Sequence, residues 1–130
     1  MAHNPFGHVD LRVQDRAVAR AFYLAFLPEL GLSVLNRGKN FDTLSCPGLA
    51  KPLQPWFGWT EDPAHVPNGN RIAFQVASRA EVDRLAALLG PAGAREISGP
   101  KAMPEYSAGY YAVFFADPSG NPLEIVHCPD

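Results

Sequence analysis

The stretch GYYAVFFADPSGNPLEIVH, residues 109–127, carries the clearest structural signal in the chain. Apolar residues dominate both of its halves, and the segment DPSG (117–120) between them has the composition of a type I turn. The stretch therefore predicts a hairpin whose strands run over about 109–117 and 122–127.

One acidic residue, Glu124, interrupts the second strand between Leu123 and Ile125. Because successive side chains of a strand point to opposite faces, Glu124 points away from the face that Leu123 and Ile125 share. If that shared face packs on a helix, the carboxylate of Glu124 lies on the helix-free face, where it faces water, pairs with a cation or binds a ligand.

The N-terminal part of the chain predicts a strand followed by a helix. In HVDLRVQD, residues 8–15, apolar and polar residues alternate, which is typical of a strand with one buried face. Asp15 is a candidate N-cap, and apolar residues recur after it at helical spacing: Val18, Phe22 and Phe26. We expect this helix to end before Gly31, with Pro28 in its last turn.

The same pattern returns half a chain later. RIAFQVAS, residues 71–78, alternates in the same way, and Ser78 with Glu81 forms the S-x-x-E capping box that opens a helix. We expect this helix to end at Gly90. The repetition indicates two copies of one supersecondary unit.

Three short strand signals follow each predicted helix. In the first half they cover about 32–37, 41–46 and 53–60, and in the second about 94–98, 109–117 and 122–127. The sequence therefore predicts an α+β fold, a single domain over residues 1–130 built from two βαβββ modules. Module one covers about 6–62 and module two about 68–130.

Composition limits the possible partners. The chain has 130 residues, 47% of them hydrophobic and 18% charged, with a formal net charge of −2, which is typical of a globular protein and gives no basic surface for nucleic acid. No apolar run is long enough to span a membrane. Cys46 and Cys128 form no CxxC pair, so we expect free thiols in a reducing cytoplasm.

Together these segments resemble the vicinal oxygen chelate superfamily, which includes glyoxalase I, bleomycin resistance proteins and extradiol dioxygenases. The resemblance rests on HVDLRV, AFYLAFLPELGLSV and YYAVFFADPSGNPLEIVH. It implies that the two modules form an open, curved mixed sheet with the helices outside. It also implies a small-molecule cleft, a divalent metal in many members, and a homodimer.

The resemblance assigns the metal-ligand positions to the first and last strands of the modules: His8, Gln54, Arg71 and Glu124. Strand alternation independently places these four residues on one face, the face away from the helices. Active metal-dependent relatives carry His or Gln, Glu or Gln, His, and Glu at these positions. Arg71 departs from that pattern because a guanidinium has no free lone pair and stays protonated in a protein.

Charge also argues against the usual metal site. Glu124 and Arg71 cancel, so a divalent ion would leave its charge uncompensated beside a fixed cation. We therefore favour no cofactor; if Ni²⁺, Mn²⁺, Zn²⁺ or Fe²⁺ binds, its ligands are His8, Gln54 and Glu124. Three roles are open for Arg71: an ion pair with Glu124, a contact with an anionic ligand group, or a position outside the cleft.

Aromatic residues are expected around this cleft. Trp56 shares the strand parity of Gln54, and further aromatics are predicted near the same mouth: Phe41, Trp59, Tyr106, and Tyr110 or Tyr111. Residues 98–109 are rich in Gly, Pro and small side chains and are predicted to form a mobile flap. Substrate contacts are expected from Trp56, Arg71, Tyr106 and Tyr110.

The function favoured is a glyoxalase-, bleomycin-resistance- or dioxygenase-like protein that binds a small molecule without the usual four-ligand metal site. One alternative is a metal-dependent lyase, isomerase or dioxygenase of the same superfamily. Another is a non-catalytic protein that sequesters a ligand such as an antibiotic, and a third is a structural protein. The sequence leaves open whether the chain is an enzyme. In a metal-free enzyme, His8 or Glu124 would be the general base, and Arg71 would stabilise an oxyanion.

Overall fold

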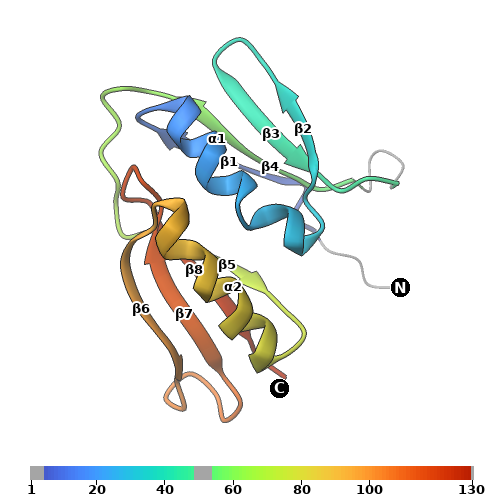
Figure 1. Cartoon of the computed structure of the whole chain (residues 1–130), viewed down its shortest axis with the longest axis vertical. Coiled ribbons are helices and arrows are strands. Elements are labelled where there is room, and N and C mark those ends of the chain that lie inside the picture. The colour runs from blue at the N-terminus through green and yellow to red at the C-terminus, as the bar shows by residue number, and fades with distance from the viewer. Residues whose placement is uncertain (1–4, 49–53, 130) are drawn as a thin grey trace. The chain divides into compact units, whose positions relative to one another are not determined.

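The computed structural model of the chain describes residues 5–48 and 54–129, in two compact units, Met1–His65 and Val66–Asp130 (Figure 1). Each unit has one principal helix and four strands in the order βαβββ, so the predicted α+β fold of two modules is confirmed. No helix in the described part of the chain is both long and apolar enough to cross a bilayer.

Unit one contains, in chain order, β1 (His8–Val13), α1 (Arg16–Leu24), the 3-10 helix η1 (Leu27–Leu30), β2 (Val34–Arg37), β3 (Phe41–Ser45) and β4 (Trp56–Glu61). Its strands lie in the order β1-β4-β3-β2, with β1 and β4 parallel and the other pairs antiparallel. The even residues of β1 are more exposed than the odd ones, as the alternation predicts. Residue 53 of the predicted fourth strand lies outside the described residues.

Unit two contains, in chain order, β5 (Ile72–Gln75), α2 (Arg79–Ala92), β6 (Arg95–Ala102), β7 (Tyr111–Ala116) and β8 (Pro122–His127). Its strand order, β5-β8-β7-β6, repeats that of unit one, with β5 and β8 parallel. The amide of Gly120 donates to the carbonyl of Asp117 at 2.8 Å, which closes the DPSG turn between β7 and β8. The predicted hairpin is therefore confirmed.

Helix α1 begins where the sequence predicts but ends earlier. The Asp15 carboxylate accepts from the Val18 amide at 3.0 Å, so the N-cap is confirmed. The α-helix stops at Leu24 because Pro28 has no N–H to donate to the carbonyl four residues earlier. The chain continues as η1 and turns at Gly31, whose φ of 92° is left-handed. Val18, predicted to face the core with Phe22, is instead 48% exposed.

Helix α2 begins at the predicted cap and runs past its predicted end. The Ser78 hydroxyl accepts from the amide of Glu81 at 3.1 Å. The end at Gly90 was wrong, since the helix continues to Ala92 and is closed by Gly93 at a φ of 105°. A left-handed φ suits glycine, and the preceding glycine remains helical.

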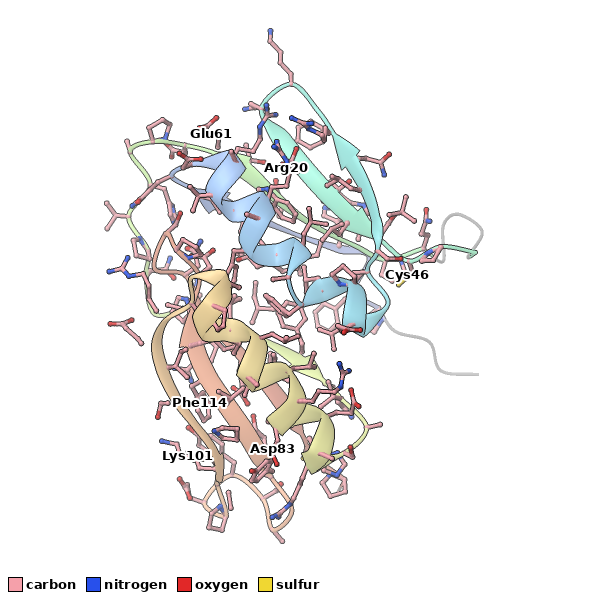
Figure 2. All side chains as sticks on the ribbon, in the orientation of Figure 1. Arg20, Cys46, Glu61, Asp83, Lys101 and Phe114 are labelled. Carbon is pink, nitrogen blue, oxygen red and sulfur yellow. The ribbon has the colours of Figure 1, made fainter. Side chains whose placement is uncertain are left out.

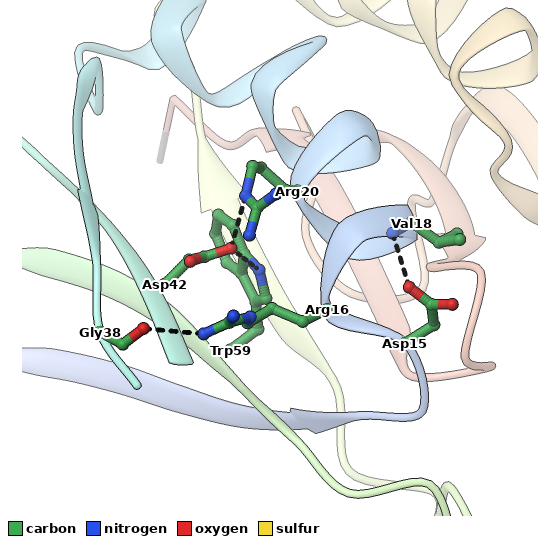
Figure 3. A network of polar contacts seen from close by, with 7 residues as sticks. All are labelled: Asp15, Arg16, Val18, Arg20, Gly38, Asp42 and Trp59. Atoms are coloured by element: carbon green, nitrogen blue, oxygen red, sulfur yellow. Dashed lines mark hydrogen bonds and ion pairs between the residues drawn. The ribbon is translucent and has the colours of Figure 1, made fainter. Parts of the chain in front are cut away.

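A buried polar network joins α1 to the sheet of unit one. Arg20 projects from α1 (Figure 2), and its Nε donates to the Asp42 carboxylate at 2.8 Å (Figure 3). The Trp59 indole N–H donates to the same oxygen at 3.2 Å. Asp42 is fully buried, and among the described residues its other oxygen, Oδ1, has no hydrogen-bond partner. Arg20 and Trp59 therefore hold Asp42 in place through a single carboxylate oxygen, Oδ2.

Trp59 was predicted near the mouth of a cleft, and this was wrong. Its side chain is 0% exposed and stacks on Tyr23 of α1, with ring centroids 4.9 Å apart. Trp56 and Trp59 are three residues apart on one strand, so they point to opposite faces. Trp59 belongs to the core of unit one.

Two predictions in unit two also need correction. Tyr111, an alternative to Tyr110 as a cleft residue, donates its hydroxyl to Asp83 of α2 at 2.7 Å and so lies on the helix side. The flap predicted over 98–109 is shorter, because β6 extends to Ala102. The loop 103–110 remains, closed by a 2.9 Å hydrogen bond from the Met103 amide to the Tyr110 carbonyl.

Candidate functional site

The helix-free face of unit two carries Glu124, the single acidic residue of strand β8. Glu124 of β8 lies opposite Ala73 of β5 and Phe114 of β7. Its neighbours along β8, Leu123 and Ile125, are fully buried on the face that α2 covers. Glu124 therefore points away from the helix, as strand alternation predicts.

The carboxylate of Glu124 is buried and held by a tyrosine. Glu124 is 4% exposed, and the Tyr110 hydroxyl donates a hydrogen bond to it. The ring of Tyr106 packs edge-on against Tyr110, with centroids 5.1 Å apart. Burial first, and then the hydrogen bond to Glu124, raise the pKa of Tyr110. Tyr110 thus stays protonated and acts as a hydrogen-bond donor to Glu124.

Two cations lie beside one ring on the same face. The guanidinium carbon of Arg71 is 5.0 Å from the centroid of the Phe114 ring, and the ammonium of Lys101 is 5.8 Å from it. Figure 2 labels Lys101 and Phe114 on unit two. Both distances fall in the range of cation–π attraction. These side chains border a hollow of about 400 Å³, whose lining residues are Arg71, Glu96, Ser98, Lys101, Met103, Tyr106, Phe114, Phe115, Ala116 and Pro122.

The helix-free face of unit one is built differently. His8 of β1 and Trp56 of β4 lie opposite each other, and their rings stack 3.9 Å apart and nearly parallel. Trp56 and Phe41 border a smaller hollow of about 180 Å³. A Cβ on Gly58 would lie 2.8 Å from the ring of Trp56, so the indole lies across the glycine.

The strand register corrects one predicted equivalence. The resemblance placed Gln54 in the last strand of module one, as the counterpart of Glu124, but β4 begins only at Trp56. Ala73, the strand partner of Glu124, lies five residues before the cap Ser78, and Asp10 lies five residues before the cap Asp15. Asp10 pairs with Gly58, so Gly58 is the unit-one position that corresponds to Glu124. The Gln54 side chain donates to the Cys46 carbonyl at 2.7 Å.

The structure thus places the predicted site residues as follows. His8 and Gln54 belong to unit one, and Arg71 and Glu124 to unit two. His8 stacks on Trp56, Glu124 accepts a hydrogen bond from Tyr110, and Tyr106 packs on Tyr110. In the described residues, no ion pair joins Arg71 to Glu124, so the first role suggested for Arg71 is not observed.

Sequence analysis missed Lys101 and Phe114. Phe114 lies directly opposite Glu124, and alternation in the hairpin could have identified it. Lys101 lies in the segment that was predicted to be a flap. Its place on the sheet depends on the irregular pairing of β6 with β7, which the sequence pattern did not predict.

Comparison with known proteins identifies the family. The model of the Glyoxalase/Bleomycin resistance protein/Dioxygenase superfamily matches residues 6–125. The chain belongs to this superfamily. Superfamily members typically bind small molecules, are often dimeric and often use divalent metals. Among curated proteins, none matches the chain.

Solved structures of this superfamily share the fold over almost the whole chain. A glyoxalase/bleomycin resistance protein from Albidiferax ferrireducens is 26% identical, with a TM-score of 0.79, covering 97% of this chain and 100% of its own. A putative glyoxalase from Bacillus halodurans is also 26% identical, with a TM-score of 0.70 and 97% of each chain covered. The fosfomycin resistance protein FosX from Listeria monocytogenes, at 17% identity, has a TM-score of 0.72, with 98% of this chain and 95% of its own covered; it shows the fold alone.

The residues present do not fit the superfamily's four-ligand metal site. Gly58, at the position that corresponds to Glu124, has no side-chain donor, and the Trp56 ring fills the space beside it. Arg71 cannot ligate a cation. Within residues 5–48 and 54–129, no cluster of three His, Cys, Asp or Glu side chains is arranged to hold a metal. Two of the four positions therefore lack a ligand atom.

Proposed function

We propose that this chain is a small-molecule-binding member of the superfamily whose site works without the four-ligand divalent metal. The binding surface is the helix-free face of unit two. The observation that carries the proposal is that Arg71 lies over Phe114 on the face of Glu124, whose carboxylate is already hydrogen-bonded to Tyr110.

The chemistry of these groups supports a metal-free site. A fixed guanidinium repels a divalent ion, whereas it attracts the negative groups that a metal would otherwise bind. Tyr110 supplies Glu124 with the donor that a buried carboxylate needs. Without a metal, the charge of Glu124 is therefore stabilised by Tyr110, and the charge of Arg71 can attract a negative group of a ligand.

Metal analysis tests this proposal directly. Purified, untagged protein is expected to contain no stoichiometric metal and to bind Ni²⁺, Mn²⁺, Zn²⁺ and Fe²⁺ weakly in calorimetric titrations. Arg71→His adds a ligand at one superfamily position, so it should raise metal affinity, while Arg37→His on the exposed strand β2 should not. Stoichiometric metal that is lost in His8→Ala or Glu124→Ala would overturn the proposal.

A second candidate is metal-free proton transfer at Glu124, in a lyase or isomerase. The burial of this carboxylate beside a protonated Tyr110 favours it, because such a pair can accept a proton from a substrate carbon and pass one back. Arg71 would stabilise the oxyanion that forms. Exchange of substrate protons with solvent deuterium, measured by NMR on small oxo acids, tests this: Glu124→Gln should abolish exchange and Glu61→Gln on β4 should preserve it.

We also propose that Trp56 contacts the substrate, that His8 can act as a base, that the protein forms homodimers and that it is cytoplasmic. The stacking of His8 on Trp56 supports the first two, the superfamily supports homodimerisation, and the free thiols Cys46 and Cys128 support a cytoplasmic location.

A further inference from the structure

We propose that the hollow of unit two binds the oxyanion of a small organic acid, a carboxylate or a phosphonate, between Arg71 and Lys101. The organic body of the ligand then lies against Phe114 and Tyr106. This inference rests on the proposed function, since it names the ligand class of the same face.

Among the described residues, the two cations have no carboxylate partner. Lys101 donates to the Ser98 hydroxyl at 2.8 Å and Arg71 lies over the Phe114 ring; in the described part of the chain, neither forms an ion pair. Other arginines do form them: Arg12 with Asp10, Arg20 with Asp42, and Arg84 with Glu81. Arg71 and Lys101 are thus available to an external anion.

The balance of charge in the hollow also favours an anion. Its lining contains two cations and one carboxylate, that of Glu96. Glu96 contacts neither cation closely enough for an ion pair. The net positive charge attracts an acid, and a planar guanidinium matches the two oxygens of a carboxylate or phosphonate. The carboxylate of Glu96 disfavours a second negative group, so the inference is limited to ligands with one oxyanion.

Irregular pairing in β6 brings Lys101 to this face. Ser98 pairs with Phe114 and Lys101 with Ala112, so both lie on one face although they are three residues apart. A regular strand would place them on opposite faces, and the register shift between them corrects this. Gly99 permits the shift: its φ is 97°, and a Cβ there would lie 2.8 Å from the Ala112 carbonyl oxygen.

The remaining lining suits a flat apolar body. Phe114 forms one wall, and Tyr106, within loop 103–110, is 56% exposed. The volume of about 400 Å³ is that of a site for a small organic molecule rather than for an inorganic ion alone. A benzoate or a phenylphosphonate meets both requirements, a charged head and a planar apolar ring.

Calorimetric or NMR titration with phenylphosphonate and benzoate, with and without a chelator, tests the inference, with benzyl alcohol as the neutral control. Both acids should bind, more weakly as NaCl rises, and benzyl alcohol should bind much less. Arg71→Gln and Lys101→Gln should each weaken acid binding at least about tenfold, because each removes a charged hydrogen-bond donor. Arg37→Gln and Lys39→Gln, on the β2–β3 hairpin of unit one, are the matched controls.

The possible results distinguish a failure of the anion site from a failure of the proposed metal-free function. Equal binding of the acids and benzyl alcohol would overturn the anion site, and so would acid binding that is unchanged in both Arg71→Gln and Lys101→Gln. Either result would still be consistent with a face that binds small molecules. Failure of both acids to bind at millimolar concentration would also overturn it. Acid binding that is lost on adding chelator would show a metal-dependent site, and would contradict the proposed function as well.

Discussion

The two units repeat one topology but use their helix-free faces differently. In unit one, residues 38–40 join β2 to β3 in a tight turn, and the position that matches Glu124 is Gly58, with Trp56 lying across it. In unit two, the longer loop 103–110 joins β6 to β7 and ends in Tyr110, which hydrogen-bonds Glu124. A duplicated scaffold thus carries an aromatic stack in one copy and a buried carboxylate with nearby cations in the other.

The largest effect on stability should come from replacing Trp59, and the second tryptophan of β4, Trp56, provides the comparison. Trp59→Ala is expected to destabilise the protein by about 3–5 kcal/mol, because it leaves a large cavity and removes a donor from buried Asp42. Trp56→Ala on the opposite face should cost much less. Denaturant unfolding of both variants measures the difference, and similar losses would contradict the assignment of Trp59 to the core.

Gly58 is the sharpest test of the face of unit one. Gly58→Ala places a methyl group against the Trp56 ring and near the Asp42 carbonyl, so we expect a loss of about 1–3 kcal/mol from overpacking. Indole fluorescence should also change as Trp56 moves away from His8. Gly69→Ala, where an added Cβ meets nothing within 4 Å, is the control. An unchanged stability would mean that the ring is not held there.

The Tyr110–Glu124 pair tests the corresponding position in unit two. Tyr110→Phe leaves a buried carboxylate without its donor, and should reduce the free energy of unfolding by about 1–3 kcal/mol. Glu124→Gln keeps an oxygen acceptor and should be milder. Tyr111→Phe removes a hydroxyl bonded to Asp83 at the surface and should have a smaller effect. Equal losses in the two Tyr→Phe variants would argue against a special role for Tyr110.

Alkaline titration should show the smallest effect. The pKa of Tyr110 is raised in the folded state, so its contribution to stability is complete below the ordinary tyrosine pKa of about 10 and is lost as the pH rises above that value. Phenolate absorbance should show a tyrosine that titrates late, and Glu124→Gln should lower its pKa toward the ordinary value. Late titration that persists in Tyr110→Phe would instead point to Tyr111, whose pKa is also raised, first by its hydrogen bond to Asp83.

Local patterns predicted most of the fold because they are set by near neighbours in the sequence. Alternation located β1 and the face of Glu124, and Asp15 and Ser78 located the starts of both helices. Helix ends were predicted less well. Pro28 ends α1 one turn before its own position, and Gly93 rather than Gly90 adopts the left-handed conformation that closes α2. The candidate site was only partly predictable. Lys101 reaches its face through a register shift, which depends on pairing with another strand.

The pairing of first strand with last strand has a consequence for synthesis. Within the described residues of each unit, the outer strand, β1 or β5, pairs with the final strand, β4 or β8. Such distant pairing delays folding, because the intervening chain must close a loop before the strands meet. Yet every strand partner of unit one precedes residue 62. During synthesis, the strands of unit one are therefore all available to pair before those of unit two have been made.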